Sequence, residues 1–566
     1  MLNFRDRLVN YLIEERDWYD EEIRAHKELD DDSKVAAGLL IRDCSVDPAS
    51  GTATAGETRF NFDENNTKTR MGDTVSVSPA GSGAPGKLHQ VLEVATDYMV
   101  LDTAATCYST TGKWDIEVFE VSMFDTYISI LQDLDQYSPG AFFLKILGDL
   151  ESPRPASMFG PDPAMKALAP SRTAGLNAMQ DLAVRRVIEE PSIHLIQGPP
   201  GTGKTHVLSC IADIFSESGK EVAILAKTHQ AVNNALNKIK SMYPSLTVVK
   251  IGQELKSDGL DPGVLNFASY RDYLKWRKTQ KHKRSSDIVG MTLQAATTNL
   301  CIRNGGFKPL LVLVDEASQI PLAEASVIGT CGAGTIVFIG DDRQMPPIFA
   351  PDQEADTLSV SVFEHLATLY PAFRTVLDTT FRMNSDICSF VSKRFYEPYG
   401  IHLSSGAAVS GRTLEIDMPE ETDERIVRIF APGSPSILTF NVSRDMFHEE
   451  KNPEEALFAA QVAVQAMKHG VPVRDIAIVT PFRKQVNEIR GFFRALGWAA
   501  ADCPLVDTVE RLQGQDVEMV ILSFSVTSEP YYRSLVTFLE NPNRLNVMVS
   551  RAKSKVVLLK ADFIRI

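Results

Sequence analysis

The segment GPPGTGKT contains three glycines, a lysine and a threonine whose spacing suits the binding of phosphate groups. Gly198, Gly201 and Gly203 leave room for backbone N–H groups to close around phosphate oxygens. Lys204 can neutralise the β- and γ-phosphates of a nucleotide, and the hydroxyl of Thr205 can ligate Mg²⁺. Because a buried-strand pattern precedes the segment and a helical pattern follows it, we predict a nucleotide-binding loop.

Two neighbouring carboxylates form a second candidate for chemistry. Asp315 and Glu316 come directly after the apolar run LLVLV. A carboxylate at the tip of a buried strand beside a phosphate-binding loop can hold the Mg²⁺ shell, and its neighbour can orient and deprotonate an attacking water. We therefore predict that Asp315 is a metal ligand and that Glu316 is the catalytic base. The alternative is that the pair only caps the next helix.

The elements that must hold these residues alternate between strands and helices from about residue 168 onward. Apolar runs typical of buried strands are SIHLI, EVAILA, LTVVKI, LLVLV and TIVFI, followed farther along by IAIVT and MVILS. Strands that alternate with helices are typical of parallel α/β domains. Two series of such strands predict two sheets, with the break near Pro351.

The residues before this region have a different pattern. Phe4, Leu8 and Leu12 recur at helical spacing, and a second helical pattern runs from Phe124 to Leu134. Between the two helices, short β-rich runs are separated by clusters of Gly, Pro, Asn and Asp, which predicts a small β-barrel. A proline-rich linker, SPRPASMFGPDPAM, follows the second helix.

Composition and charge restrict the class of protein. The chain has 566 residues and a formal charge of −15, with apolar and charged fractions that are ordinary for globular domains. No apolar run reaches the ~18 residues that a membrane span needs, so we expect no membrane partner and a cytoplasmic location. The seven cysteines, Cys301 among them, form no CxxC pair, which argues against a zinc module. The acidic charge argues against bulk-charge binding of nucleic acid but allows a locally basic channel.

Six further motifs occur in a fixed order, and together they carry a family resemblance. They are DEASQ (315–319), GDDRQMPP (340–347), TTFRMN (379–384), VTPFRKQ (479–485), VDTVERLQGQD (506–516) and NRLNVMVSRAK (543–553). Their order and approximate spacing resemble superfamily 1 helicases, most of all the 5′-to-3′ branch with the nonsense-mediated-decay RNA helicase and the replication helicase–nuclease. The resemblance covers roughly residues 170–560 and the motor part only, with no nuclease.

This resemblance implies an α/β fold of two RecA-like P-loop domains in tandem, with an N-terminal helical stalk that carries the β-barrel. The second RecA-like domain then follows the break near Pro351. The predicted boundaries are 1–35 for the stalk helix, 36–120 for the barrel, 121–167 for the second stalk helix and linker, 168–350 for the first RecA-like domain with a short insertion at about 241–286, and 351–566 for the second RecA-like domain.

The resemblance also implies ATP and Mg²⁺ as cofactors and gives roles to residues around the nucleotide. Gln180 resembles the glutamine that reads the adenine edge, although it would otherwise be interpreted as a surface residue of its helix. Gln344 resembles the sensor that couples the γ-phosphate to domain movement. Arg382 and Arg551 resemble two arginines that reach the γ-phosphate from the second domain and offset its charge.

Two positions depart from the residue that is usual in this family. Phe381 occupies the place of an aromatic residue, often tyrosine, that stacks on the base, and stacking survives the loss of the hydroxyl. Asp516 occupies the place of a ribose contact that is more often glutamate. The shorter side chain puts discrimination of the ribose in doubt.

Contacts to a nucleic-acid strand are implied at small polar residues near strand ends. They are Thr228, Asn233, Thr292, Thr480 and Thr508. Hydroxyls and amides at such places can grip phosphates without reading sequence. Each of these residues can instead be a helix cap or a turn residue.

The basic run KWRKTQKHKR, residues 275–284, is a further candidate for the nucleic-acid path. Trp276 within it could stack on a base. The alternative is a solvated surface helix.

The function that these patterns favour is an ATP-dependent helicase or translocase that moves 5′-to-3′ along single-stranded nucleic acid, DNA or RNA, as a monomer and with a recruiting protein partner. The alternative is an ATPase that remodels or clamps protein–nucleic-acid complexes without separating strands. An ordinary P-loop kinase or small GTPase is disfavoured, because those folds have no need for the distal motifs. The barrel is interpreted as a wedge or clamp over the strand, or else as a structural appendage.

Overall fold

The computed structural model describes all residues except 1–3, 49–55, 64, 66, 68, 70, 84–85, 96, 104–106, 120–123, 134–137, 150–161, 190–192, 258, 281–286, 299–308, 332, 354–355, 418–422, 443–449, 499–501, 513–514 and 566. Leu134, Cys301, most of the predicted proline-rich linker and residues 281–284 of the basic run therefore lie outside the described residues. Among the described residues, no helix is both long and apolar enough to cross a membrane.

The N-terminal region contains the predicted barrel. Its six strands close in the order β1-β2-β5-β4-β3-β6 with antiparallel pairing. Phe60, Val75, Val91, Met99 and Leu101 fill the interior and are fully buried. The strands are β1 (Leu40–Val46), β2 (Thr58–Asn61), β3 (Thr74–Pro79), β4 (Lys87–Val94), β5 (Tyr98–Leu101) and β6 (Lys113–Val118).

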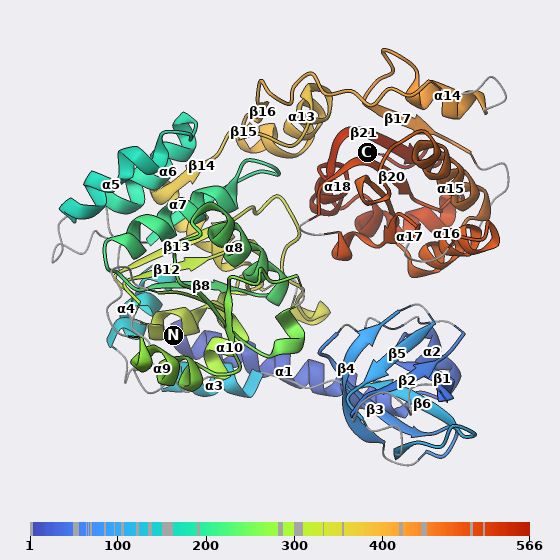
Figure 1. Ribbon diagram of the computed structural model, residues 1–566, viewed down its shortest axis with the longest axis horizontal. Helices are drawn as coiled ribbons and strands as arrows, with labels where there is room; N and C mark the ends of the chain where they lie inside the picture. Colours follow the sequence, from blue (N-terminus) through green and yellow to red (C-terminus); the bar gives the residue numbers. More distant parts are fainter. Residues whose placement is uncertain are drawn as a thin grey trace.

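Helices attach the barrel to the first α/β domain. They are α1 (Phe4–Glu28), α2 (Asp31–Ala36), α3 (Phe124–Gln132) and α4 (Ser138–Leu147). Leu8, Leu12 and Leu131 are buried in the same hydrophobic cluster as residues of the first sheet, which confirms the predicted helical spacing. From beneath that sheet α1 runs to the barrel (Figure 1). The carboxylate of Glu15 accepts a hydrogen bond from the N–H of Ala350 at 3.0 Å. Helix α1 therefore also contacts the loop of the first α/β domain that contains Ala350.

The first α/β domain contains an eight-stranded sheet with the order β10-β9-β11-β8-β12-β13-β7-β14, in which every pairing is parallel. Its strands are β7 (Ile193–Gln197), β8 (Val222–Ala226), β9 (Val248–Ile251), β10 (Leu265–Phe267), β11 (Ile288–Thr292), β12 (Leu311–Val314), β13 (Thr335–Gly340) and β14 (Arg374–Val376). The central strands are buried on both faces, as covered parallel sheets are.

The helices of this domain cover both faces of the sheet (Figure 1). They are α5 (Pro163–Thr173), α6 (Ala178–Glu189), α7 (Lys204–Glu217), α8 (His229–Met242), α9 (Tyr270–Thr279), α10 (Leu293–Thr298), α11 (Leu322–Ala325) and α12 (Val362–Leu369).

The structure corrects two predicted features of this domain. Residues 241–286 are not an insertion, because they supply the strands β9 and β10 of the sheet and the helix α9. The domain does not end near Pro351, because β14 pairs with β7 and belongs to the first sheet. The boundary therefore follows Val376. The strands that the prediction missed, β10 and β14, are the two edges of the sheet and have only three residues each, so they carry weak sequence patterns.

The second α/β domain has a five-stranded parallel sheet with the order β17-β21-β20-β18-β19. The strands are β17 (Ile437–Phe440), β18 (Ile476–Val479), β19 (Leu505–Asp507), β20 (Val517–Ser523) and β21 (Ala552–Leu559). A separate short parallel pair, β15 (Thr379–Thr380) and β16 (Ser404–Ser405), precedes this sheet in the chain. The helices are α13 (Ser385–Val391), α14 (Glu424–Phe430), α15 (Pro453–Lys468), α16 (Arg483–Ala495), α17 (Glu529–Leu539) and α18 (Pro542–Val549). The predicted α/β class with two parallel sheets is confirmed.

Candidate active site

A cavity of about 740 Å³ lies between the two α/β domains and collects the residues predicted to contact a nucleotide. All of the predicted ATP-site residues except Gly198 line it. From the first domain come Gln180, Gly201, Gly203, Lys204, Thr205, Asp315, Glu316 and Gln344, and from the second come Phe381, Arg382, Asp516 and Arg551. The cavity is therefore completed only when both domains are in place.

The phosphate-binding loop joins β7 to α7. Its backbone conformation and the close approach of neighbouring side chains require glycine at positions 201 and 203. Gly201 and Gly203 have φ angles of +74° and +82°, in the left-handed region that favours glycine. A Cβ atom at Gly203 would lie 2.7 Å from Nε2 of Gln180. The Lys204 ammonium donates to the carbonyl oxygen of Gly198 at 2.6 Å, so it lies within the loop. The N-terminus of α7, at Lys204 and Thr205, borders the cavity, and the first N–H groups of a helix suit an anion.

The acidic pair lies directly after β12, as predicted. Asp315 is 5% exposed and accepts a hydrogen bond from the N–H of Glu316 at 3.0 Å. Burial and the charge of Glu316 raise the pKa of Asp315, while Lys204 opposes that change. Glu316 has a φ of +50°, which is uncommon for a residue other than glycine and is often found at functional sites. Thr205 and Asp315 contribute oxygen atoms to the same cavity, and this donor set fits Mg²⁺.

Gln180 and Phe381, the residues predicted to contact a base, both line the cavity. Gln180 exchanges hydrogen bonds with Asn177 and donates from Nε2 to the carbonyl of Thr202 at 2.9 Å, which ties it to the phosphate-binding loop. Phe381 is 45% exposed, and its N–H donates to the carbonyl of Gly201 at 2.8 Å. An exposed ring beside the loop can stack on a base. Reading of the adenine edge by Gln180 stays a prediction.

The two arginines predicted to reach the γ-phosphate, Arg382 and Arg551, line the cavity, as does Arg412. Arg551 donates from Nη2 to Oε1 of Gln344 at 2.9 Å, which links it to the predicted sensor of the first domain. Burial and the nearby Arg382 lower the pKa of Arg551 to about 10, so it remains a cation at neutral pH. Arg382 donates from Nη1 to the carbonyl of Ser550 at 2.9 Å. Two cations here would face the γ-phosphate of a nucleotide bound by Lys204.

Asp516 has a partner that the sequence did not indicate. It lines the cavity, and its carboxylate forms an ion pair with the Arg382 guanidinium. The negative charge of Asp516 offsets the positive charge of Arg382, which lies close to Arg551. Contact between Asp516 and a ribose stays a prediction.

Two of the five residues predicted to contact a nucleic-acid strand cap helices with their side chains in this structure. Thr228 caps α8 by accepting from the N–H of Ala231 at 3.2 Å, and Thr292 accepts in the same way at the start of α10. The predicted residues at 233, 292, 480 and 508 are buried. For Thr228 and Thr292 the geometry favours the alternative of a helix cap. Direct contact with phosphates stays a prediction for Thr228, Asn233, Thr292, Thr480 and Thr508.

Trp276 has packing partners that the sequence did not indicate, and its stacking on a base stays a prediction. Its ring is partly buried and packs against Phe267 and Tyr273, with ring centroids 5.5 and 6.2 Å apart, at the border of the hydrophobic core. Arg277 forms ion pairs with Glu221 and Asp287. The described part of the basic run is therefore a helix that packs on the first domain.

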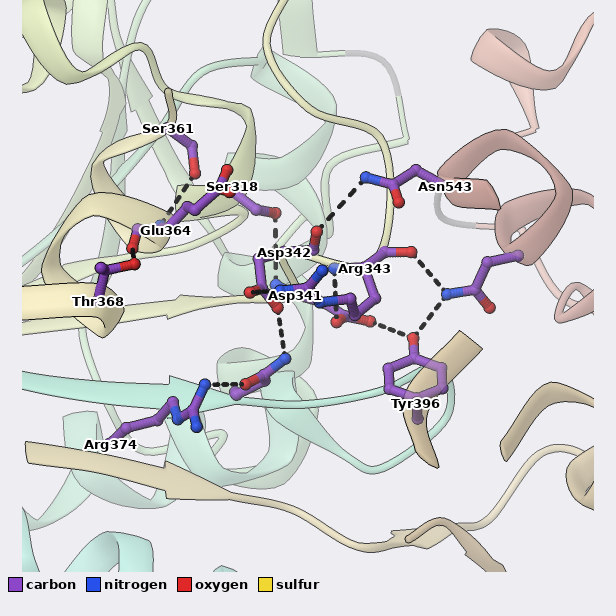
Figure 2. Close-up of polar contacts among 12 residues, drawn as sticks. Ser318, Asp341, Asp342, Arg343, Ser361, Glu364, Thr368, Arg374, Tyr396 and Asn543 are labelled. Atoms are coloured by element: carbon purple, nitrogen blue, oxygen red, sulfur yellow. Dashed lines mark hydrogen bonds and ion pairs between the residues drawn. The ribbon is translucent and has the colours of Figure 1, made fainter. Parts of the chain in front are cut away.

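Three buried residues that the prediction missed join the two domains beside the cavity. Figure 2 shows Tyr396 of the second domain reaching Asp341 of the first. Asn546 donates to the Tyr396 hydroxyl and to the carbonyl of Arg343. Asp341 and Asn546 lie within two of the recognised motifs, which could have marked them, whereas Tyr396 lies in none.

Comparison with solved structures gives an arterivirus nonstructural protein 10 (helicase). The two chains are 13% identical with a TM-score of 0.39, and the match covers 91% of this chain and 79% of that chain.

Comparison with protein families and curated proteins covers both α/β domains. Residues 175–362 and 358–561 each match a family described as an AAA domain. The DNA replication ATP-dependent helicase/nuclease of Xenopus laevis is 28% identical over 419 residues, covering 70% of this chain and 38% of that protein. The regulator of nonsense transcripts 1 homolog of Drosophila melanogaster is 26% identical over 440 residues, covering 71% of this chain and 35% of that protein. The chain thus spans well under half the length of these two relatives. Together with the ordered motifs and the cavity that they line, these sequence matches support a superfamily 1 helicase of the type represented by the regulator of nonsense transcripts and the DNA replication helicase/nuclease.

Proposed function

We propose that this chain hydrolyses ATP in the cavity between its two α/β domains and uses the cycle to move along a single nucleic-acid strand. One observation carries the proposal. A phosphate-binding lysine and a carboxylate of the first domain line the same cavity as two arginines of the second. Because hydrolysis removes the γ-phosphate that both domains would hold, it changes how strongly the domains attract each other.

The proposed reaction is an attack of water on the γ-phosphorus of ATP, with cleavage of its bond to the bridging oxygen. Glu316 orients the water and accepts its proton, and Lys204 holds the β- and γ-phosphates. Arg382 and Arg551 offset the charge on the group being transferred. Mg²⁺, held by Thr205 and Asp315, would neutralise phosphate charge.

The proposed movement is 5′-to-3′, as the family suggests. All residues of the proposed ATP site come from one chain, which supports a monomeric motor. We also propose a cytoplasmic location and recruitment by a partner protein.

We expect single-stranded nucleic acid to raise the ATPase rate severalfold, because strand binding favours the closed arrangement of the domains. The test measures ATPase rates of the full chain with single-stranded DNA and RNA of equal length, at about 50 and 200 mM salt. Stimulation should weaken at the higher salt, because phosphate contacts release counterions.

The outcomes separate the alternatives. An ATPase rate indifferent to either strand would refute the proposal. Strand-stimulated ATPase without duplex opening would instead support the second candidate, an ATPase that remodels or clamps protein–nucleic-acid complexes. That candidate is supported by the burial of four of the five predicted strand contacts, Asn233, Thr292, Thr480 and Thr508, whereas Thr228 is exposed.

We further propose that the barrel acts as a wedge against a duplex. It contributes no residue to the nucleotide cavity. Lys256 of the first domain forms an ion pair with Asp73 of the barrel at 2.7 Å, which fixes one side of the barrel beside the helix that Thr228 caps. A rigid body in that position can meet the second strand while the motor pulls on the first.

Replacing residues 36–120 with a short flexible linker should leave basal ATPase largely intact and sharply reduce duplex separation. The stalk helices keep their packing, since Leu8 and Leu131 lie in the core of the first domain. ATPase and fluorescent unwinding assays are run on the same preparation. Unwinding at the parental rate would defeat the wedge proposal, and loss of both activities in folded protein would assign the barrel a structural role.

A further inference from the structure

The hydroxyl of Tyr396 lies in a fully buried junction between the two α/β domains. Tyr396 ends a π-helical turn, η9 (Ser392–Tyr396), and its ring is part of the hydrophobic core of the second domain. The hydroxyl donates to Oδ2 of Asp341 in the first domain at 2.6 Å. It accepts from Nδ2 of Asn546 on α18 of the second domain at 2.8 Å. One oxygen atom therefore connects two elements of the second domain to the loop after β13.

The Asp341 carboxylate continues this connection toward the nucleotide cavity. Its Oδ2 atom accepts from Nε2 of Gln344 at 2.6 Å, and Oε1 of Gln344 accepts from Arg551 at 2.9 Å. Nε of Arg551 donates to the carbonyl of Val547 at 3.3 Å. Because Val547 and Asn546 are neighbours on α18, the contacts close a ring that crosses the domain interface twice.

A second direct contact holds α18 against the same loop. Nδ2 of Asn546 donates to the carbonyl of Arg343 at 2.7 Å, and Nδ2 of Asn543 donates to the carbonyl of Asp342 at 3.4 Å (Figure 2). The helix that precedes Arg551 is therefore set against the loop that carries Gln344. The position of the arginine relative to the glutamine depends on these contacts.

Burial gives these hydrogen bonds their weight. Asp341, Tyr396 and Asn546 are each 0% exposed, and a buried polar group that loses its partner is costly. Burial raises the pKa of Asp341 and raises that of Tyr396 well above its usual value, so the tyrosine stays a hydrogen-bond donor at neutral pH. A phenylalanine at position 396 would leave the carboxylate and the Asn546 amide each without one partner.

We propose that Tyr396 is a positioning residue for ATP hydrolysis, which sets Arg551 of the second domain in register with Gln344 of the first. The inference rests on the proposed function, because the register matters only when both side chains act on the γ-phosphate. Tyr396 itself does not line the nucleotide cavity and touches no reacting atom. It acts through Asp341 and Asn546.

Tyr396→Phe in the full chain should lower the strand-stimulated kcat about fivefold while leaving the KM for ATP within about twofold, because misplacement affects the transition state more than binding. The matched control is Tyr273→Phe. Tyr273 is also fully buried and donates to a carboxylate, that of Asp287 at 2.8 Å, but it lies in the first domain away from the cavity. The control should keep the parental kcat. Thermal unfolding and the stoichiometry of fluorescent ADP binding verify that each variant is folded and fully active in binding.

A double variant separates positioning from general destabilisation. If Tyr396 and Asn546 act through the same ring, Tyr396→Phe/Asn546→Ala should be no slower than the slower single variant, whereas Tyr273→Phe/Asn546→Ala should equal the product of its single effects. Multiplying effects in the first pair, or a parental kcat in both Tyr396→Phe and Asn546→Ala, would overturn the inference. If Tyr396→Phe does not fold, Asn546→Ala alone carries the test. A parental chain without strand-stimulated ATPase would instead count against the proposed function.

Discussion

Replacing Glu316 with glutamine should leave nucleotide binding near the parental value and lower ATP turnover by roughly 10²–10⁴-fold, the range that a general base contributes. Glutamine has nearly the shape of glutamate, so the left-handed backbone at this position and the contact with the Asp315 carboxylate are retained. It cannot accept a proton from water at neutral pH. The loss should therefore appear in kcat and not in affinity.

Lys204→Ala provides the contrast that makes this result specific. The lysine ammonium lies within the phosphate-binding loop, and its removal deletes a phosphate ligand, so both affinity and hydrolysis should be lost. Binding of a fluorescent ATP analogue and steady-state ATPase are measured on both variants and the parent. Equal loss of affinity in the two variants would contradict the assignment of Glu316 as the base.

The parts of the site that could be predicted are those fixed by local chain geometry. The phosphate-binding loop is continuous in sequence, and its glycines, its lysine and the strand and helix around it lie within one short segment. Asp315 could be placed because it directly follows a fully buried strand. In both cases, the carboxyl end of a parallel strand determines where the side chain lies. The pattern of the nearest residues was therefore sufficient.

The parts that could not be predicted depend on contacts between distant segments. The edge strand β14 has only three residues, and its place in the first sheet depends on β7, far back in the chain. Trp276 lies in a run of charges that indicates a solvated face, yet its ring is placed by Phe267. Tertiary packing overrides the local pattern in such cases.

The role of Asp516 shows the same limit at the site itself. Its position in the motif implied a ribose contact, but the side chain that approaches it in space is Arg382, which comes much earlier in the chain. No periodicity or spacing connects these two residues. Their ion pair depends on the tertiary fold of the second domain, which brings the two segments together.

Arg551→Ala should lower strand-stimulated ATP turnover by about two or more orders of magnitude, because an arginine that reaches a transferring phosphoryl group is worth roughly 10³–10⁵ in rate. The side chain is 5% exposed and remains charged beside Gln344. Its removal leaves the Gln344 carbonyl next to a polar cavity that water can enter, so the fold should be retained. Nucleotide binding should weaken much less than turnover, since Lys204 still holds the phosphates.

The matched control is Arg544→Ala on α18, the helix that precedes Arg551. Arg544 forms an ion pair with Glu510 at 2.7 Å and lies over the ring of Phe538, so it loses comparable local contacts without lining the cavity. Strand-stimulated ATPase and thermal unfolding are measured on both variants and the parent. We expect turnover near the parental value for Arg544→Ala. A near-parental rate for Arg551→Ala would show that this arginine only fixes Gln344, and an equal fall in both variants would assign the loss to disruption of α18 and not to missing charge at the γ-phosphate.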